Sequence, residues 1–218
     1  MQYLLKKSRK RKTVAIKIKS GKVIVYAPEH ICEQWLYSWV NSKSDWIASK
    51  LAQGVEHTKN RPLTTNKIAI FGDKFTIIKQ AQALSFIDFD KKTLNLDESK
   101  DSWGELLKLL EMTLSDYLDM AIAKYQPDIN AQFDTLKIRL YKSRWGSFSS
   151  KGVIAFNTLL VGAPKWVIEY VVVHELCHYH VMAHNSSFWS LVNIHYGEKY
   201  QDARKYLKEH GRALMIEN

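Results

Sequence analysis

The chain has 218 residues, of which 46% are hydrophobic and 25% are charged, and its formal net charge is +10. These proportions allow an ordinary hydrophobic core in one domain or two closely packed lobes, without disulfides or oligomerisation. The sequence has no apolar run long enough to cross a bilayer and no apolar stretch behind its basic N-terminus, which argues against a membrane protein and a secretory signal. Its two cysteines lie in unrelated contexts, so we expect a reducing, cytoplasmic location.

The positive charge is concentrated at the N-terminus. Nine of the 32 Lys and Arg residues lie within residues 1–22, which contain no acid. Such an arm can hold nucleic acid, nucleotide phosphates or an acidic protein segment. It can equally be a solvated strand whose lysines protect a sheet edge. The second interpretation is favoured, because a run of charge alone specifies no ligand.

The first half of the chain is expected to consist of strands and one helix. Alternating apolar residues on both sides of Ser20-Gly21 predict a β-hairpin over residues 13–27. Apolar residues at helical spacing predict an amphipathic helix over residues 30–51, and a polar linker follows at 53–66. Short apolar runs then predict four strands, at residues 67–71, 74–79, 84–89 and 93–96.

The second half is expected to be mainly helical. Ser102 and Glu105 have the spacing of a capping box, and Pro127 should end the helix that they begin near residue 125. The remaining predicted elements are strands at 136–140 and 153–160 around a loop, a buried helix at 166–182, a short helix from Asn185 to Gly197, and a last helix at 200–214.

The chemistry is concentrated in the sequence VVVHELCHYHVMAH, residues 171–184. On a helix, His174 and His178 lie one turn apart on the same face, so both imidazoles can bind one Zn²⁺. Glu175 lies about 100° round the helix from His174, where it can take a proton from zinc-activated water without itself becoming a ligand.

A catalytic zinc needs a third protein ligand, and His184 is the natural candidate. It is the tenth residue after His174, which matches the spacing of HExxHxxGxxH, although Val181 occupies the glycine position. His180 faces away from the other two histidines and is a poorer candidate. The alternatives are metal-free core histidines and a purely structural zinc, but unpaired polar groups on an apolar helix are costly and structural sites are usually closed by a fourth Cys or His.

The chain resembles the YgjP-like metallopeptidase family of bacterial zincins over nearly its whole length. The segments that carry the resemblance are SRKRKTVAIKI, Asp45-Trp46-Ile47 with Lys50-Leu51, Arg144-Trp145-Gly146-Ser147, Asn157, Ala163-Pro164, the segment from Val171 to His178, and His184-Asn185-Ser186 with Phe188-Trp189. The resemblance implies that His174, His178 and His184 are the metal ligands and that Glu175 is the catalytic residue. Phe148 departs from the pattern, which has Cys there.

Together these observations predict an α+β fold. Residues 1–101 would form a basic β-hairpin, a helix and a β-rich lobe, and residues 102–218 a zincin-like catalytic lobe with its active-site helix on a small mixed sheet. One continuous YgjP-like domain is the alternative division.

Several other residues are candidates for substrate binding. Arg144 can bind a substrate carboxylate or phosphate, stabilise an oxyanion, or pair with an acid of its own loop. Asn157 can bind substrate or connect its strand to the helix. Residues 153–160 can be an edge strand to which an extended peptide adds.

The leading hypothesis is therefore a zinc-dependent hydrolase that cleaves peptide bonds. A second hypothesis keeps the same site but cleaves a phosphoanhydride of a nucleotide, with Mg²⁺ or Mn²⁺ as the more usual ion. A third is a nucleic-acid-binding module with a structural zinc.

Overall fold

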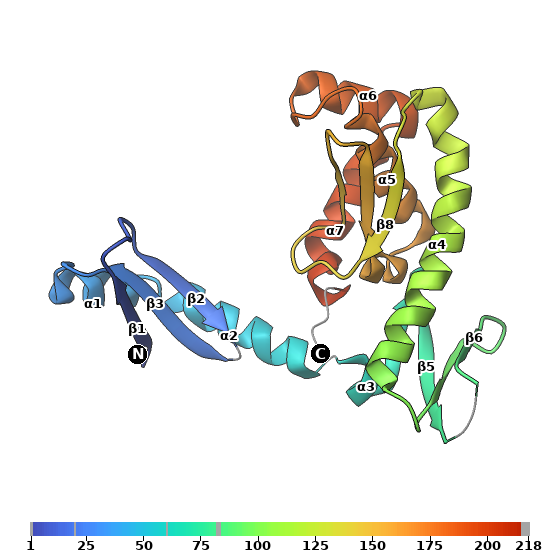
Figure 1. Cartoon of the computed structure of the whole chain (residues 1–218). Helices are drawn as coiled ribbons and strands as arrows, with labels where there is room; N and C mark the ends of the chain where they lie inside the picture. Colours follow the sequence, from blue (N-terminus) through green and yellow to red (C-terminus); the bar gives the residue numbers. More distant parts are fainter. Residues whose placement is uncertain (1, 20, 60, 82–83, 215–218) are drawn as a thin grey trace. The chain divides into compact units, whose positions relative to one another are not determined.

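The chain folds into two units, residues 1–60 and 61–218, each with its own hydrophobic core (Figure 1). The computed structural model describes residues 2–19, 21–59, 61–81 and 84–214. The boundary between the two units, at residues 60/61, lies about 40 residues before the expected boundary at 101/102. The strands of segment 67–97 belong to the second unit because they share one hydrophobic core with the helices that follow residue 101.

The first unit is a three-stranded sheet beside two helices. Its strands lie in the order β1-β3-β2, with β1 (Leu4–Ser8) parallel and β2 (Ala15–Lys19) antiparallel to β3 (Lys22–Pro28). The predicted hairpin is thus confirmed. The basic segment before it contributes β1, which the apolar pattern does not predict.

Two helices replace the single helix expected over residues 30–51. The helix α1 (Glu33–Asn41) ends where the Ser42 hydroxyl donates a hydrogen bond to the Trp39 carbonyl. The helix α2 (Ser44–Lys59) then continues through most of the segment expected as a linker, so that expectation is wrong over residues 53–59. Apolar periodicity cannot detect this break, because both helices bury their apolar residues against the same sheet.

The second unit begins with the short helix α3 (Pro62–Thr65) and a four-stranded sheet in the order β4-β5-β7-β6. The strands are β4 (Lys67–Ile70), β5 (Asp73–Gln80), β6 (Phe86–Asp88) and β7 (Thr93–Asp97), which confirms the four predicted strands. Phe71 and Gly72 both have positive φ, 52° and 86°, as a tight two-residue hairpin turn requires.

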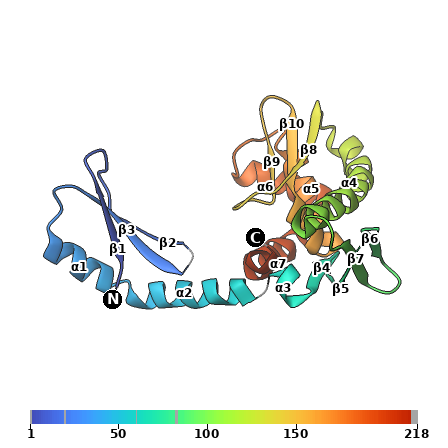
Figure 2. The same cartoon turned by 60° about the horizontal axis from the view of Figure 1, so that its bottom comes forward.

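The long helix α4 (Ser102–Ile129) runs past this sheet and packs beside α5 (Lys165–Cys177) (Figure 2). Its N-cap is Asp101, whose carboxylate accepts from the backbone N–H of Trp103 and Gly104, so the predicted Ser102 capping box is wrong. The predicted end near residue 125 is also wrong. Pro127 lies in the last turn, where its missing N–H costs one hydrogen bond, and the helix ends at Asn130 in the left-handed conformation.

The second sheet of this unit, the third in the chain, has the strand order β8-β10-β9. The strands β8 (Thr135–Arg139) and β10 (Val153–Asn157) confirm two predicted strands, and β9 (Gly146–Phe148) lies in the segment expected as a loop. Because β10 pairs with β8 on one side and β9 on the other, the expectation that it is an edge strand is wrong.

The last elements are the 3₁₀ helix η1 (Thr158–Gly162), α5, α6 (Ser186–Tyr196) and α7 (Tyr200–Leu214). The predicted helices at 185–197 and 200–214 are confirmed, and Gly211 does not interrupt α7. The helix α5 ends at Cys177, five residues before the predicted end at 182. The predicted α+β class is confirmed, and among the described residues no helix is both long and apolar enough to cross a membrane.

Replacing Asp101 by Ala should lower the free energy of unfolding by about 1 kcal/mol, because two backbone N–H groups at the start of α4 lose their acceptor. Ser102→Ala is the matched control and should change it by less than about 0.5 kcal/mol. Urea unfolding followed by circular dichroism measures both. If Ser102→Ala lowered the free energy of unfolding more than Asp101→Ala does, Ser102 would be the N-cap, as the capping-box prediction had it.

Candidate metal centre

Three histidines converge at the end of α5. His174 lies in the last turn of the helix, His178 is its C-cap, and His184 directly precedes Asn185, the N-cap of α6. Their candidate ligand nitrogens all lie within 4.8 Å of one another. The Nε2 atoms of His174 and His184 are 3.0 Å apart. The structure thus brings together the three residues that the sequence singles out.

The early end of α5 makes this convergence possible. The N–H groups of His180 and Val181 both donate to the carbonyl of Cys177, which closes a turn beyond the helix. The side chain of Asn185 then accepts from the N–H of Phe188 and begins α6. None of residues 178–185 has positive φ, so Val181 can occupy the position where the sequence pattern has glycine.

Hydrogen bonds orient the rings of two of the three histidines. Nδ1 of His178 lies 3.0 Å from the carbonyl oxygen of Val181, to which it can donate. Nδ1 of His174 lies 3.3 Å from the hydroxyl of Tyr170, one turn earlier in α5. With their protons on Nδ1, both rings present an unprotonated Nε2 to an ion, which is the usual arrangement at zinc sites.

The arrangement fits a zinc ion. Zn–N bonds of about 2.0–2.1 Å in tetrahedral geometry separate two nitrogens by about 3.3 Å, close to the 3.0 Å between His174 and His184. Burial, with smaller contributions from the charges of His178, His184 and Arg204, lowers the pKa of His174 to about 3. Burial also lowers the pKa of His178. Both rings are therefore neutral at pH 7, as metal ligands must be.

An aromatic wall surrounds the three rings. The ring of Phe188 lies 4.8, 4.5 and 4.9 Å from those of His174, His178 and His184. His180 is directed elsewhere, because its Nε2 lies 2.7 Å from the carbonyl oxygen of Ile129. Its exclusion from the ligand set agrees with the sequence prediction for the helix face.

Glu175 is a buried carboxylate that the protein leaves partly unsatisfied. Only 5% of the residue is exposed, and its Oε2 has no hydrogen-bond partner among the described residues. Burial raises the pKa of Glu175 to about 8, against the opposing positive charge of Arg144. An orphaned carboxylate oxygen on the residue that follows His174 is unusual, because buried polar atoms in folded proteins normally have partners.

Gly146 is a site residue to which the sequence argument assigned no role. A Cβ atom built on Gly146 would lie 2.6 Å from Oε1 of Glu175. The strand β9 therefore passes the catalytic candidate so closely that only glycine fits. The one signal in the sequence is the glycine within Arg144-Trp145-Gly146-Ser147, which says nothing about which side chain approaches it.

Of the two residues proposed for substrate binding, Asn157 is buried and Arg144 is exposed. Asn157 is fully buried, and its amide Nδ2 donates to the carbonyls of Tyr141 and Arg144 at 3.0 and 2.9 Å. It holds the loop before β9 and is not placed to touch a substrate. Arg144 is exposed, and its guanidinium lies 5.7 Å from the centre of the Tyr141 ring.

A second arginine near the histidines was not expected. Arg204 of α7 places its guanidinium 4.0 Å from the centre of the Trp189 ring. That ring stacks on Tyr200, and its Nε1 donates to the carbonyl of His184. The regular apolar spacing of α7 predicts an ordinary surface helix and gives no sign of this contact.

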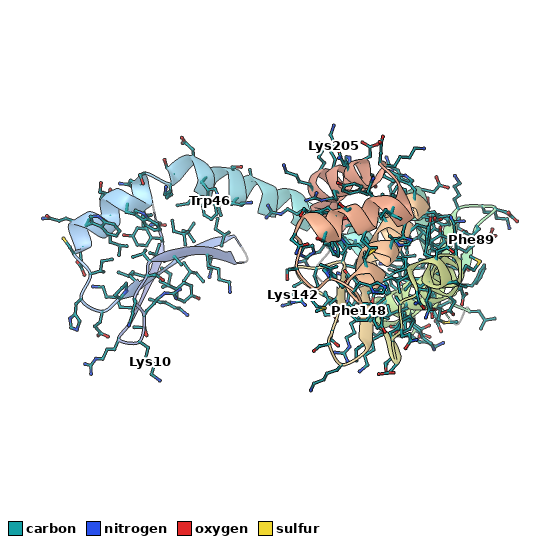
Figure 3. All side chains as sticks on the ribbon, turned by 90° about the horizontal axis from the view of Figure 1, so that it is seen from above. Lys10, Trp46, Phe89, Lys142, Phe148 and Lys205 are labelled. Atoms are coloured by element: carbon teal, nitrogen blue, oxygen red, sulfur yellow. The ribbon has the colours of Figure 1, made fainter. Side chains whose placement is uncertain are left out.

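Two features near α5 take no part in the site. Cys177 is fully buried, and burial raises its pKa to about 12, which makes its thiol inert. Phe148, which is labelled in Figure 3, is the departure from the family pattern; its ring packs edge-to-face on that of Tyr179, with the ring centres 6.3 Å apart. Phe148 therefore fills space beside the site and provides no ligand.

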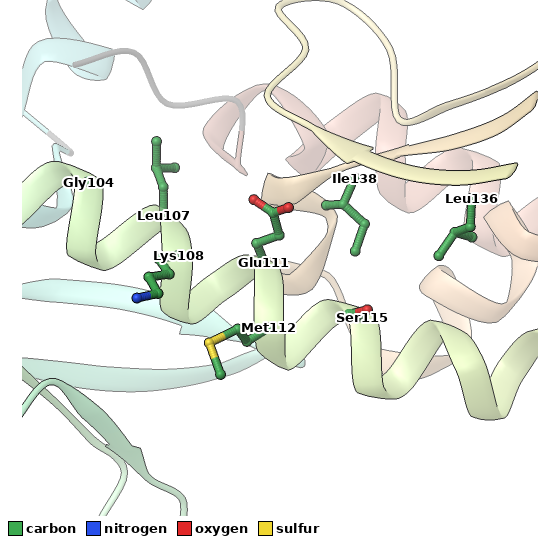
Figure 4. Close-up of a pocket in the computed structure, with 8 residues that line it drawn as sticks. All are labelled: Gly104, Leu107, Lys108, Glu111, Met112, Ser115, Leu136 and Ile138. Carbon is green, nitrogen blue, oxygen red and sulfur yellow. The ribbon is translucent and has the colours of Figure 1, made fainter.

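An open groove of about 600 Å³ lies between α4 and β8, with the labelled side chains of both elements around it (Figure 4). Its lining includes Met112 and Glu111 of α4 and Leu136 and Ile138 of β8. None of the residues that line it belongs to the histidine cluster or neighbours Glu175. It is separate from the candidate metal centre.

Comparison with known proteins gives one family. The model of the YgjP-like metallopeptidase domain matches residues 12–210. No curated protein matches the chain. Among solved structures, the crystal structure of the metallopeptidase zymogen of Pyrococcus abyssi abylysin is similar at 23% identity, covering 44% of this chain and 92% of that chain with a TM-score of 0.35.

Replacing any one of the three histidines by Ala should remove the ion, with an affinity for zinc at least about 100-fold lower, because two imidazoles rarely hold Zn²⁺ alone. His180→Ala is the matched control and should bind zinc as the unchanged protein does, since its ring contacts Ile129. Zinc content after dialysis and a competition titration with a chelator measure both. One zinc per chain retained in His184→Ala would remove that residue from the ligand set.

Proposed function

The chain belongs to the YgjP-like metallopeptidase family, and from this premise we propose that it is a zinc-dependent peptidase. His174, His178 and His184 would hold the ion, and Glu175 would act as the general base. The observation that carries the proposal is an unsatisfied carboxylate oxygen of Glu175, in the last turn of α5, next to one of three histidines whose nitrogens converge. Three protein ligands leave a position open, as catalytic zinc sites require.

A Zn²⁺ ion bound there would polarise a peptide carbonyl and lower the pKa of a water molecule to about 7. The protein's own contribution begins with Glu175, which the positive charge of the bound ion would hold as a carboxylate despite its burial, so that it would take the proton of the attacking water and deliver it to the leaving nitrogen. Because Oε2 of Glu175 has no partner among the described residues, it is available to that water. The Tyr170 hydroxyl keeps the His174 ring in orientation.

The strand β9 is the proposed docking edge for an extended peptide. It pairs with β10 on one side, and no other described strand pairs with it. Its Gly146 lies against Glu175, so a peptide added to the free edge of β9 would pass beside the general base. This replaces residues 153–160 as the proposed edge. Arg144, exposed directly before β9, would then be placed to bind an acidic group of the substrate.

The hypothesis of a nucleotide hydrolase receives less support from the ligand set. Mg²⁺ prefers oxygen ligands in octahedral geometry, and the cluster offers three nitrogens. A structural zinc also receives less support, since no fourth Cys, Asp, Glu or His joins the three among residues that the structure describes. We retain the cytoplasm as the proposed location, because both cysteines are free.

Glu175→Gln should lower kcat/KM by about 10²–10⁴-fold while zinc content stays at one per chain, because the amide cannot accept the proton. Cleavage of a peptide library with added zinc, read by mass spectrometry, measures the effect. Glu169→Gln is the control from the same helix. Glu169 pairs with Lys124 and accepts from Tyr117 at 2.8 Å, so its loss should affect stability and leave turnover unchanged. Full activity of Glu175→Gln would exclude the general-base role.

Gly146→Ala should retain zinc and lose at least about 100-fold in kcat/KM, because the new methyl group displaces the Glu175 carboxylate from its position. Ser147→Ala tests the neighbouring residue of β9, whose side chain points to the opposite face of the sheet, and should be nearly neutral. Activity assays on both variants, with zinc content measured in parallel, separate displaced geometry from lost metal. Equal activity in the two variants would contradict the close approach.

A further inference from the structure

The sheet of the first unit has two different faces. Along β3, Val23, Val25 and Ala27 are buried against the helices, while Ile24 and Tyr26 point to the opposite face and remain half-exposed. Among the described residues, none on that opposite face belongs to the core of the first unit. We call it the open face.

The register of the strands fixes the neighbours of these two residues. Ile24 lies between Leu4 of β1 and Lys17 of β2. Tyr26 lies between Lys6 of β1 and Ala15 of β2. A lysine thus lies beside each of the two half-buried residues of the central strand. The guanidinium of Arg11 lies 5.0 Å from the centre of the Tyr26 ring.

The open face has positive charge without compensation. Residues 1–28 contain no Asp or Glu. The first acids that follow pair with other cations, Glu33 with Lys7 at 2.6 Å and Glu29 with Arg9 at 3.7 Å. By the alternation of β1, Lys7 points to the helices, where Leu5 also packs. Among described residues, no ion pair forms at Lys6, Lys17 or Lys22.

The open face combines an aromatic ring and a planar guanidinium with several lysines, and this combination favours one class of partner. Aromatic rings and guanidinium planes stack on unpaired bases, and lysines around them neutralise backbone phosphates. Sheet faces with exposed aromatic side chains bind single strands in this way, whereas a duplex is read by an element that enters a groove. An acidic peptide would use the lysines and leave the Tyr26 ring without a role.

We propose that the open face of the β1-β3-β2 sheet binds single-stranded nucleic acid. Tyr26 and Arg11 would stack on bases, and Lys6, Lys17 and Lys22 would contact phosphates. Lys10, which projects from the turn between β1 and β2, extends the cationic edge (Figure 3). The inference is independent of the proposed peptidase activity, because none of these residues belongs to the metal centre.

The first test is binding of the full chain to a fluorescent oligothymidylate of about 12 nucleotides, read by anisotropy at several salt concentrations. Three phosphate contacts, from Lys6, Lys17 and Lys22, predict a slope of log K against log salt of about −2. The matched probe is an abasic oligomer of the same length and charge. It should bind about tenfold more weakly, because it offers no base to stack.

The second test is a pair of substitutions at Tyr26. Tyr26→Leu should weaken binding of oligothymidylate about tenfold and leave binding of the abasic oligomer unchanged. Tyr26→Phe should bind both as the unchanged protein does, since the ring is retained. Circular dichroism establishes that each variant is folded. Equal weakening of both probes by Tyr26→Leu would show that the ring stacks on no base and would overturn the proposal.

The third test separates the two faces by charge. Lys6→Gln with Lys17→Gln removes two cations from the open face and should reduce the salt slope by about 1.4. Lys7→Gln with Lys43→Gln removes the same charge from the helix side of the unit and should leave the slope unchanged. Equal effects of the two pairs, or competition by oligoglutamate as strong as that by oligothymidylate, would identify a general attraction for polyanions and contradict the inference.

Discussion

The site depends on three imidazole nitrogens that the protein holds within 4.8 Å of one another. The end of α5 at Cys177 sets this distance, because a helix continuing to residue 182 would carry His184 away from the other two. The ring of Phe188 contacts the rings of all three histidines. The apolar surroundings keep His174 and His178 neutral and exclude bulk water, and both effects favour a metal ion over protons.

The same constraint explains the unusual state of Glu175. Placing His174 on a buried helix forces the next residue into the interior as well. There its carboxylate meets the backbone of Gly146 and lacks a partner for Oε2. A protein retains such a costly arrangement where the group has chemistry to perform. Asn157 supports it at a distance, since its amide fixes the loop that leads into β9.

Patterns in the sequence correctly predicted the elements that depend on interactions between residues close together in the chain. The strands β2–β8 and β10 and the last two helices follow from apolar periodicity and from caps such as Asn185, and the pairing of His174 with His178 follows from helical spacing. The wrong predictions concern features that depend on a residue outside the pattern or on a distant part of the chain. Asp101 caps α4 in place of Ser102, and β9 forms only because β10 offers an edge. The contact of Gly146 with Glu175 joins residues 29 positions apart, which no periodicity reports.

The most direct test of the central claim is X-ray diffraction at the zinc absorption edge on crystals of the zinc-loaded protein. The account predicts a single anomalous peak between the rings of His174, His178 and His184, with Zn–N distances of about 2.0–2.1 Å and no fourth protein ligand. A peak at another position, a fourth side chain completing the coordination, or no peak near these rings at full zinc loading would contradict it.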